Sequence, residues 1–66
     1  MTIFVKKIGT SKRGPFCTFV ADFENGYFIN GIANLDGLEV KENTSYKDLY
    51  LEQQIFNGMV RYTLHK

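Results

Sequence analysis

The stretch that decides the fold is Phe16-Cys-Thr-Phe-Val-Ala-Asp-Phe-Glu24, followed by Asn25-Gly26 and then by Tyr27-Phe-Ile-Asn-Gly-Ile-Ala-Asn-Leu35. Two runs rich in aromatic and β-branched residues flank the Asn-Gly dipeptide, and this pattern is typical of a β-hairpin. Both turn residues tolerate the positive φ that a type I′ turn requires. We therefore predict a two-residue turn, with Phe23 facing Phe28 and Phe19 facing Ile32.

Both faces of this predicted hairpin are substantially apolar. One face carries Phe19, Ala21, Phe23, Phe28, Asn30 and Ile32; the other carries Phe16, Thr18, Val20, Asp22, Tyr27, Ile29, Ala33 and Leu35. Asp36-Gly37 is a second turn signal, and a two-residue turn there would pair Leu35 with Leu38. This pairing favours the second face as the core. The phenylalanines of the first face would then point outward. Gly31 keeps the opposite assignment open, because a strand glycine often marks a bulge and a slip of one residue exchanges the faces.

The flanking segments predict further strands. Thr2 to Ile8 is short and β-branched, whereas Gly9 to Pro15 has the glycines, proline and polar residues of an exposed basic loop. Glu42 to Tyr46 is a polar connection. Asn57-Gly58 predicts a C-terminal hairpin, one face of which carries Leu49, Leu51, Gln53, Ile55, Val60, Tyr62 and Leu64. A short helix over residues 46–56 is the alternative, because Ser45 with Asp48 resembles a capping box.

These elements predict an all-β fold in one domain over residues 1–66, a small antiparallel barrel of five to six strands. The order of the strands fits an OB-like barrel, with an SH3-like barrel as the alternative. The strand order and the placing of the aromatics resemble those of small phage-type OB proteins that bind single strands. The resemblance implies a phage or mobile-element protein that binds single-stranded DNA. A chain of 66 residues has little core of its own, so we also expect a homodimer.

Composition excludes several classes of function. The single cysteine, Cys17, precludes an internal disulfide and favours a reducing, cytoplasmic location. No stretch is apolar enough for a membrane span or a signal peptide. The single histidine, His65, has no acid, base or thiol near it in sequence, and one Cys with one His cannot form a zinc site. We therefore expect no enzyme, no metal site and no cofactor.

Charge and aromatic content favour single-stranded nucleic acid as the partner. Net charge is only +1, but no acidic residue precedes Asp22, and the chain end is basic again. Single-strand binding needs cations for the phosphates and flat side chains for the bases. The predicted phosphate contacts are Lys6, Lys7, Lys12, Arg13 and Arg61. The predicted stacking residues are Phe19, Phe23 and Phe28, with Asn30 as a hydrogen-bonding neighbour.

A module that binds a host or viral protein is the alternative function. Tyr50, Phe56 and Met59 share one face of the predicted C-terminal hairpin with Arg61. Aromatic residues, Met and Arg are enriched in protein interfaces. A phage-encoded inhibitor or accessory factor would use such a face.

Overall fold

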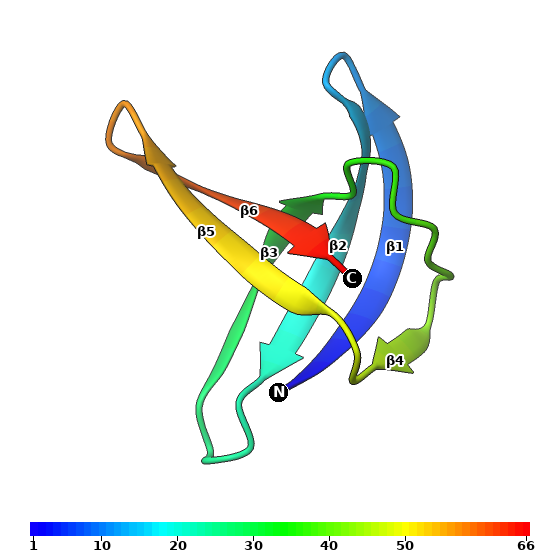
Figure 1. The fold of residues 1–66 in the computed structure, drawn as a ribbon, viewed down its shortest axis with the longest axis vertical. Coiled ribbons are helices and arrows are strands. Elements are labelled where there is room, and N and C mark those ends of the chain that lie inside the picture. Colours follow the sequence, from blue (N-terminus) through cyan, green and yellow to red (C-terminus); the bar gives the residue numbers. More distant parts are fainter.

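The structure, a computed structural model of residues 1–66, is all-β and consists of one six-stranded sheet (Figure 1). The strands are β1 (Thr2–Ser11), β2 (Gly14–Asp22), β3 (Phe28–Asn34), β4 (Thr44–Tyr46), β5 (Tyr50–Phe56) and β6 (Met59–His65). Their order in the sheet is β4-β1-β2-β3-β6-β5. All neighbours are antiparallel except β3 and β6, which are parallel. The all-β class and the count of six strands are thus as expected.

The sheet curls but does not close into the barrel that the sequence predicted. β4 and β5 are its two edges, and no ladder joins β5 to β1 or β4. The β5–β6 hairpin instead crosses over the inner face of β1, β2 and β3 (Figure 1). No part of the chain forms a helix that is long and apolar enough to cross a membrane.

The core lies between that inner face and the crossing hairpin. Its nine buried residues are Ile3, Val5, Cys17, Phe19, Ala21, Ala33, Leu35, Leu49 and Leu64. Phe19 is the largest fully buried side chain, and its ring meets the ring of Tyr62 edge-on, with centroids 5.5 Å apart. Tyr62 belongs to β6, so this contact joins the two halves of the sheet.

The register of the β2–β3 hairpin differs from the prediction by one residue. Phe19 pairs with Gly31 rather than with Ile32, and Asp22 pairs with Phe28. The predicted two-residue turn is wrong, because residues 23–27 form a longer loop in which Glu24 and Gly26 have positive φ. This slip turns Phe19 into the core and leaves Phe28 on the outer face.

The β1–β2 connection also differs from the prediction. β1 continues to Ser11, which pairs with Gly14, so the expected loop from Gly9 to Pro15 shrinks to a tight turn at residues 12–13. The extension depends on Gly9, because Phe16 lies across it. A Cβ at Gly9 would stand 2.7 Å from Cζ of that ring.

The C-terminal half follows the sequence more closely. The strand prediction for residues 46–56 is confirmed over Tyr50–Phe56, and Phe56 pairs with Met59 across the predicted Asn57-Gly58 turn. Asp36-Gly37 also forms a turn, closed by the Leu38 amide donating to the Leu35 carbonyl. The next strand begins only at Thr44, so the hairpin predicted at this turn does not form. The expected polar connection contains a short strand, β4, paired with β1.

Candidate nucleic-acid interface

The outer face of β1, β2 and β3 exposes apolar side chains beside polar ones. Because Phe19 and Ala21 point inward, the alternate residues of β2 point outward, and their partners on β3 share that face. Phe28 and Ile32 are the most exposed of these, at 61% and 60%. Asn30 lies between them on the same strand and the same face. Apolar surface exposed in this way is a candidate binding platform.

Two hairpin turns flank one end of this face, and a groove lies between them. The turns are residues 12–13, between β1 and β2, and residues 57–58, between β5 and β6. The groove, called here the inter-hairpin groove, has a volume of about 300 Å³. It is lined by Arg13, Ile32, Asn34, Met59, Val60, Arg61 and Tyr62. A second depression of about 270 Å³ continues from it over Phe16 and shares Arg13, Ile32 and Asn34.

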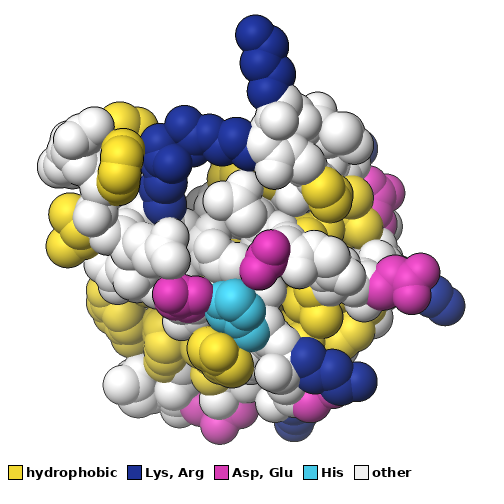
Figure 2. All heavy atoms as spheres, turned by 45° about the horizontal axis from the view of Figure 1, so that its top comes forward, with side chains coloured by type: hydrophobic (Ala, Val, Ile, Leu, Met, Phe, Trp, Pro, Cys, Tyr) yellow, Lys and Arg dark blue, Asp and Glu magenta, His cyan; other side chains and the backbone are white.

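Arginine side chains border the inter-hairpin groove on both sides. Arg13 comes from the β1–β2 turn, and Arg61 comes from β6. The Arg61 guanidinium carbon lies 5.1 Å from the centre of the Phe56 ring, a cation–π contact that fixes the arginine beside the groove. Figure 2 shows Lys and Arg side chains gathered along the top of the view, next to exposed hydrophobic side chains. The groove therefore offers positive charge and apolar surface together.

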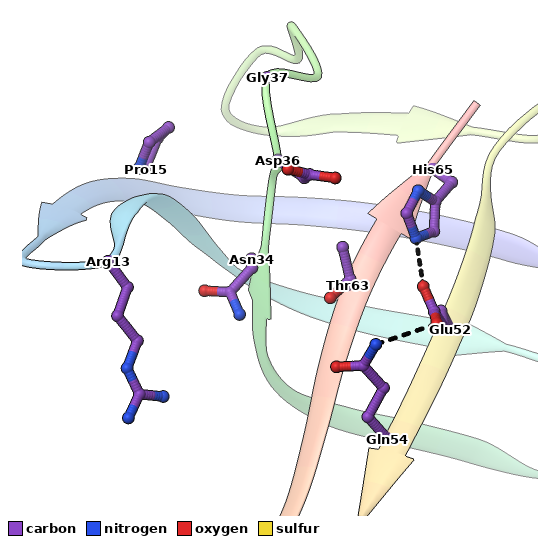
Figure 3. A pocket seen from close by; sticks show the side chains of 9 residues that line it. All are labelled: Arg13, Pro15, Asn34, Asp36, Gly37, Glu52, Gln54, Thr63 and His65. Carbon is purple, nitrogen blue, oxygen red and sulfur yellow. Dashed lines mark hydrogen bonds and ion pairs between the residues drawn. The ribbon is translucent and has the colours of Figure 1, made fainter.

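A polar pocket of about 420 Å³ adjoins the groove (Figure 3). Its lining is entirely polar or small: Arg13, Pro15, Asn34, Asp36, Gly37, Glu52, Gln54, Thr63 and His65. Arg13 and Asn34 belong to both cavities. The side chains of Arg13, Asn34 and Asp36 have no hydrogen-bond or ion-pair partner within the chain. They are free to bind a polar ligand.

Glu52 is the centre of the one hydrogen-bonded cluster in this pocket. Its Oε1 lies 2.5 Å from His65 Nε2, and its Oε2 accepts a bond of 3.0 Å from Gln54 Nε2. The bond to His65, followed by that to Gln54, holds the pKa of Glu52 below its ordinary range. The Tyr50 ring stacks on the His65 ring with centroids 5.0 Å apart.

The pairing of His65 was missed in the sequence, where the histidine has no acid near it. Glu52 is thirteen residues away along the chain, and the β5–β6 hairpin brings it within hydrogen-bond distance. The alternation of side chains about the Asn57-Gly58 turn places both residues on one face of the hairpin. That alternation was the signal that could have found the pair.

Apart from Phe19 and Phe23, the predicted nucleic-acid residues divide into three groups. Phe28 and Asn30 lie on the outer face, joined there by Lys7, which pairs with Thr18. Arg13 and Arg61 border the inter-hairpin groove. The exposed cations Lys6 and Lys12 stand at the register shift in β1 and at the β1–β2 turn.

Phe19 and Phe23 do not lie with Phe28, which corrects their prediction as exposed stacking residues. Phe19 is fully buried, and Phe23 packs against the core. The one-residue slip in the β2–β3 register is the physical reason, because it exchanges the faces of β2 while leaving those of β3 unchanged.

The residues predicted for a protein interface are exposed. Tyr50, Phe56 and Met59 are 54%, 57% and 60% accessible and share one face of the β5–β6 hairpin. Phe56 and Met59 are cross-strand neighbours beside Arg61, at the border of the inter-hairpin groove. The groove can thus contact phosphates through its arginines, flat rings through its aromatic border, and hydrogen-bonding edges through its polar pocket. No protein-family model, curated protein or solved structure matches the chain.

Proposed function

We propose that this protein binds single-stranded nucleic acid in the inter-hairpin groove and across the outer face of β1, β2 and β3. The observation that carries the proposal is the position of Arg13 and Arg61 on either side of a groove that contains exposed Ile32. The exposed ring of Phe28 lies farther along the same face. Cations beside apolar and aromatic surface are what a single strand requires, because its phosphates and bases alternate.

Each side chain has a role suited to its chemistry. Arg13 and Arg61 contact phosphate oxygens, and a guanidinium does so through two parallel hydrogen bonds. Lys7 extends the basic track across the outer face. Phe28 and Phe56 are the stacking rings, replacing Phe19 and Phe23 in that role. Asn30, together with Asn34 in the groove, offers hydrogen bonds to base edges.

We further infer that the fold is an open barrel of the OB kind. β1, β2 and β3 form an antiparallel meander, and β6 with β5 completes a five-stranded order on its far side. OB barrels are partly open and bind oligonucleotides on the face of their second and third strands and on the flanking loops. The outer face of β2 and β3, with the β1–β2 and β5–β6 turns beside it, supports this assignment.

The test is a fluorescence-anisotropy titration with a labelled dT oligonucleotide at two salt concentrations. Binding should be micromolar or tighter at low salt. It should weaken steeply as the salt concentration rises, because binding releases counterions from the phosphates and added salt opposes that release. Arg13→Gln and Arg61→Gln should each weaken binding and reduce the salt slope by about 0.7. Phe28→Ala should cost about 1–3 kcal/mol of binding free energy without unfolding the protein.

Two matched controls separate these effects from general ones. Lys41→Gln removes the same charge from the connection after Leu35, away from the groove lining. Tyr27→Ala removes an aromatic ring that is as exposed as Phe28, at 61%, but lies in the β2–β3 loop. Both should bind like the wild type. Absence of binding at low salt, or equal losses in the control variants, contradicts the proposal.

A protein-binding module is the second candidate, favoured by the exposure of Phe56 and Met59 on one face of the β5–β6 hairpin. It predicts no salt-sensitive binding to oligonucleotides. It also predicts a stable complex with one host or viral protein that is lost in Phe56→Ala and retained in Phe28→Ala.

A further inference from the structure

β5 has an unpaired edge. The pairs between β5 and β6 alternate between those that exchange backbone hydrogen bonds and those that do not, starting from a bonded pair, Phe56 with Met59, at the two-residue turn. The N–H and C=O groups of Leu51, Gln53 and Ile55 therefore point away from β6. None of the backbone bonds outside the strand ladders involves them.

β5 does little to protect this edge, because its one charged side chain, Glu52, is bonded to His65 of β6. Natural edge strands are shortened or carry proline, lysine or a bulge, which discourage pairing with another chain. β4, at the opposite edge, has only three residues, whereas β5 has seven and none of these features. Ile55 is 73% exposed, the highest value for any large hydrophobic residue in the chain.

We propose that β5 pairs antiparallel with β5 of a second copy, about a two-fold axis at Gln53. In this register Leu51 of one copy faces Ile55 of the other, and Gln53 faces its own equivalent. These are the residues whose N–H and C=O groups are free, so each of the pairs exchanges two hydrogen bonds. In a register shifted by one residue, free N–H and C=O groups of one copy would face groups of the other copy that are already bonded to β6. The geometry therefore excludes that register.

The side chains of β5 are complementary in the same register. The sequence Tyr50-Leu-Glu-Gln-Gln-Ile-Phe56 has the same order of residue types from either end. An aromatic residue is followed by an aliphatic one and then by Glu or Gln, with Gln53 at the centre. Tyr50 faces Phe56, and Glu52 faces Gln54 rather than another carboxylate. Aromatic and aliphatic cross-strand pairs stabilise a sheet, and like charges directly opposite would destabilise it. The pairing also brings the exposed side chains of Tyr50 and Ile55 against the second copy.

The register is tested by a disulfide. Directly opposite residues of a bonded pair have Cα atoms about 5.5 Å apart, within the range of a disulfide. Gln53→Cys should therefore give a covalent dimer under mild oxidation. Gln54→Cys is the matched control, because its equivalents lie diagonally, about 7–8 Å apart. The native Cys17 gives no background, since it is fully buried and burial raises the pKa of its thiol to about 11.

The dimer itself is tested by light scattering over a range of concentrations. The wild type should show twice the mass of the chain, and Ile55→Lys should raise the dimer dissociation constant about tenfold or more, because each dimer carries the edge lysine twice. Tyr27→Lys also places a lysine at an exposed hydrophobic position, but outside β5, and this variant should remain dimeric. A wild type that is monomeric at every concentration overturns the proposal. So does a Gln54→Cys variant that cross-links as readily as Gln53→Cys. Neither outcome depends on nucleic-acid binding.

Discussion

Among single residues, Glu52 makes the stability of the fold depend on pH. Its bonds with His65 and Gln54 lower the pKa of its carboxyl in the folded protein. A folded-state pKa below the unfolded value means that the ionised carboxylate stabilises the fold. This contribution is fully present above the unfolded pKa of about 4.3 and is lost as pH falls through the lower folded pKa.

We therefore expect Glu52→Gln to be less stable than the wild type at neutral pH, with the difference shrinking in acid. Urea denaturation at a series of pH values measures it. Glu39→Gln is the control, because Glu39 is exposed and has no hydrogen-bond partner. A difference between Glu52→Gln and the wild type that is the same at neutral and acidic pH would show that the carboxylate bonds do not stabilise the fold.

Among the elements, the β5–β6 hairpin depends on its turn. Asn57 and Gly58 have φ of 50° and 76°, the left-handed values of a type I′ turn. Gly58→Ala forces a Cβ into that conformation and should cost about 1 kcal/mol of unfolding free energy. Gly31→Ala is the control, because Gly31 has no positive φ and an added Cβ would lie 3.7 Å from Phe19. Equal losses in the denaturation midpoints of the two variants would argue against turn strain.

The two Asn-Gly dipeptides explain how much of the fold could be predicted. Asn57-Gly58 forms the predicted turn, with both residues at the positive φ that a type I′ turn requires. In the other hairpin, the side chains of Asp22 and Asn25 accept bonds from the amides of Glu24 and Tyr27, which stabilise a longer loop. The sequence therefore located the strands of both hairpins but the register of only one.

The candidate site shows the same division between local and distant causes. The cations of the β1–β2 turn were visible in the sequence, because a basic, glycine-containing segment is a local feature. The burial of Phe19 depends on Tyr62, which is distant along the chain. The inter-hairpin groove likewise exists only because β3 pairs with β6. Neither contact follows from the alternation of residues within a hairpin.

In the whole molecule, the β1–β2–β3 meander and the β5–β6 hairpin are two units of the sheet, and few hydrogen-bonded pairs join them. β1, β2 and β3 are joined by long antiparallel ladders, with one register shift in β1 between Val5 and Lys7. The β5–β6 hairpin is hydrogen-bonded to them through only two parallel pairs, Ala33 with Tyr62 and Asn34 with Thr63. The core contacts of Leu51, Tyr62 and Leu64 add to this attachment. The free energy needed to open a segment held by few bonds is lower than the free energy of unfolding the whole protein.

Amide hydrogen exchange followed by NMR should separate these units. We expect the bonded amides of β6 to exchange faster than those of β2, through an opening that leaves the β1–β2–β3 meander folded. A saturating dT oligonucleotide should slow exchange in β6 more than in β2, because a strand held by Arg13 and Arg61 bridges the two units. Arg61→Gln, tested at the same oligonucleotide concentration, should lose that extra protection. Equal exchange in β2 and β6 without ligand would mean that the sheet opens only as one body, and the two pairs between β3 and β6 would then suffice to join its halves.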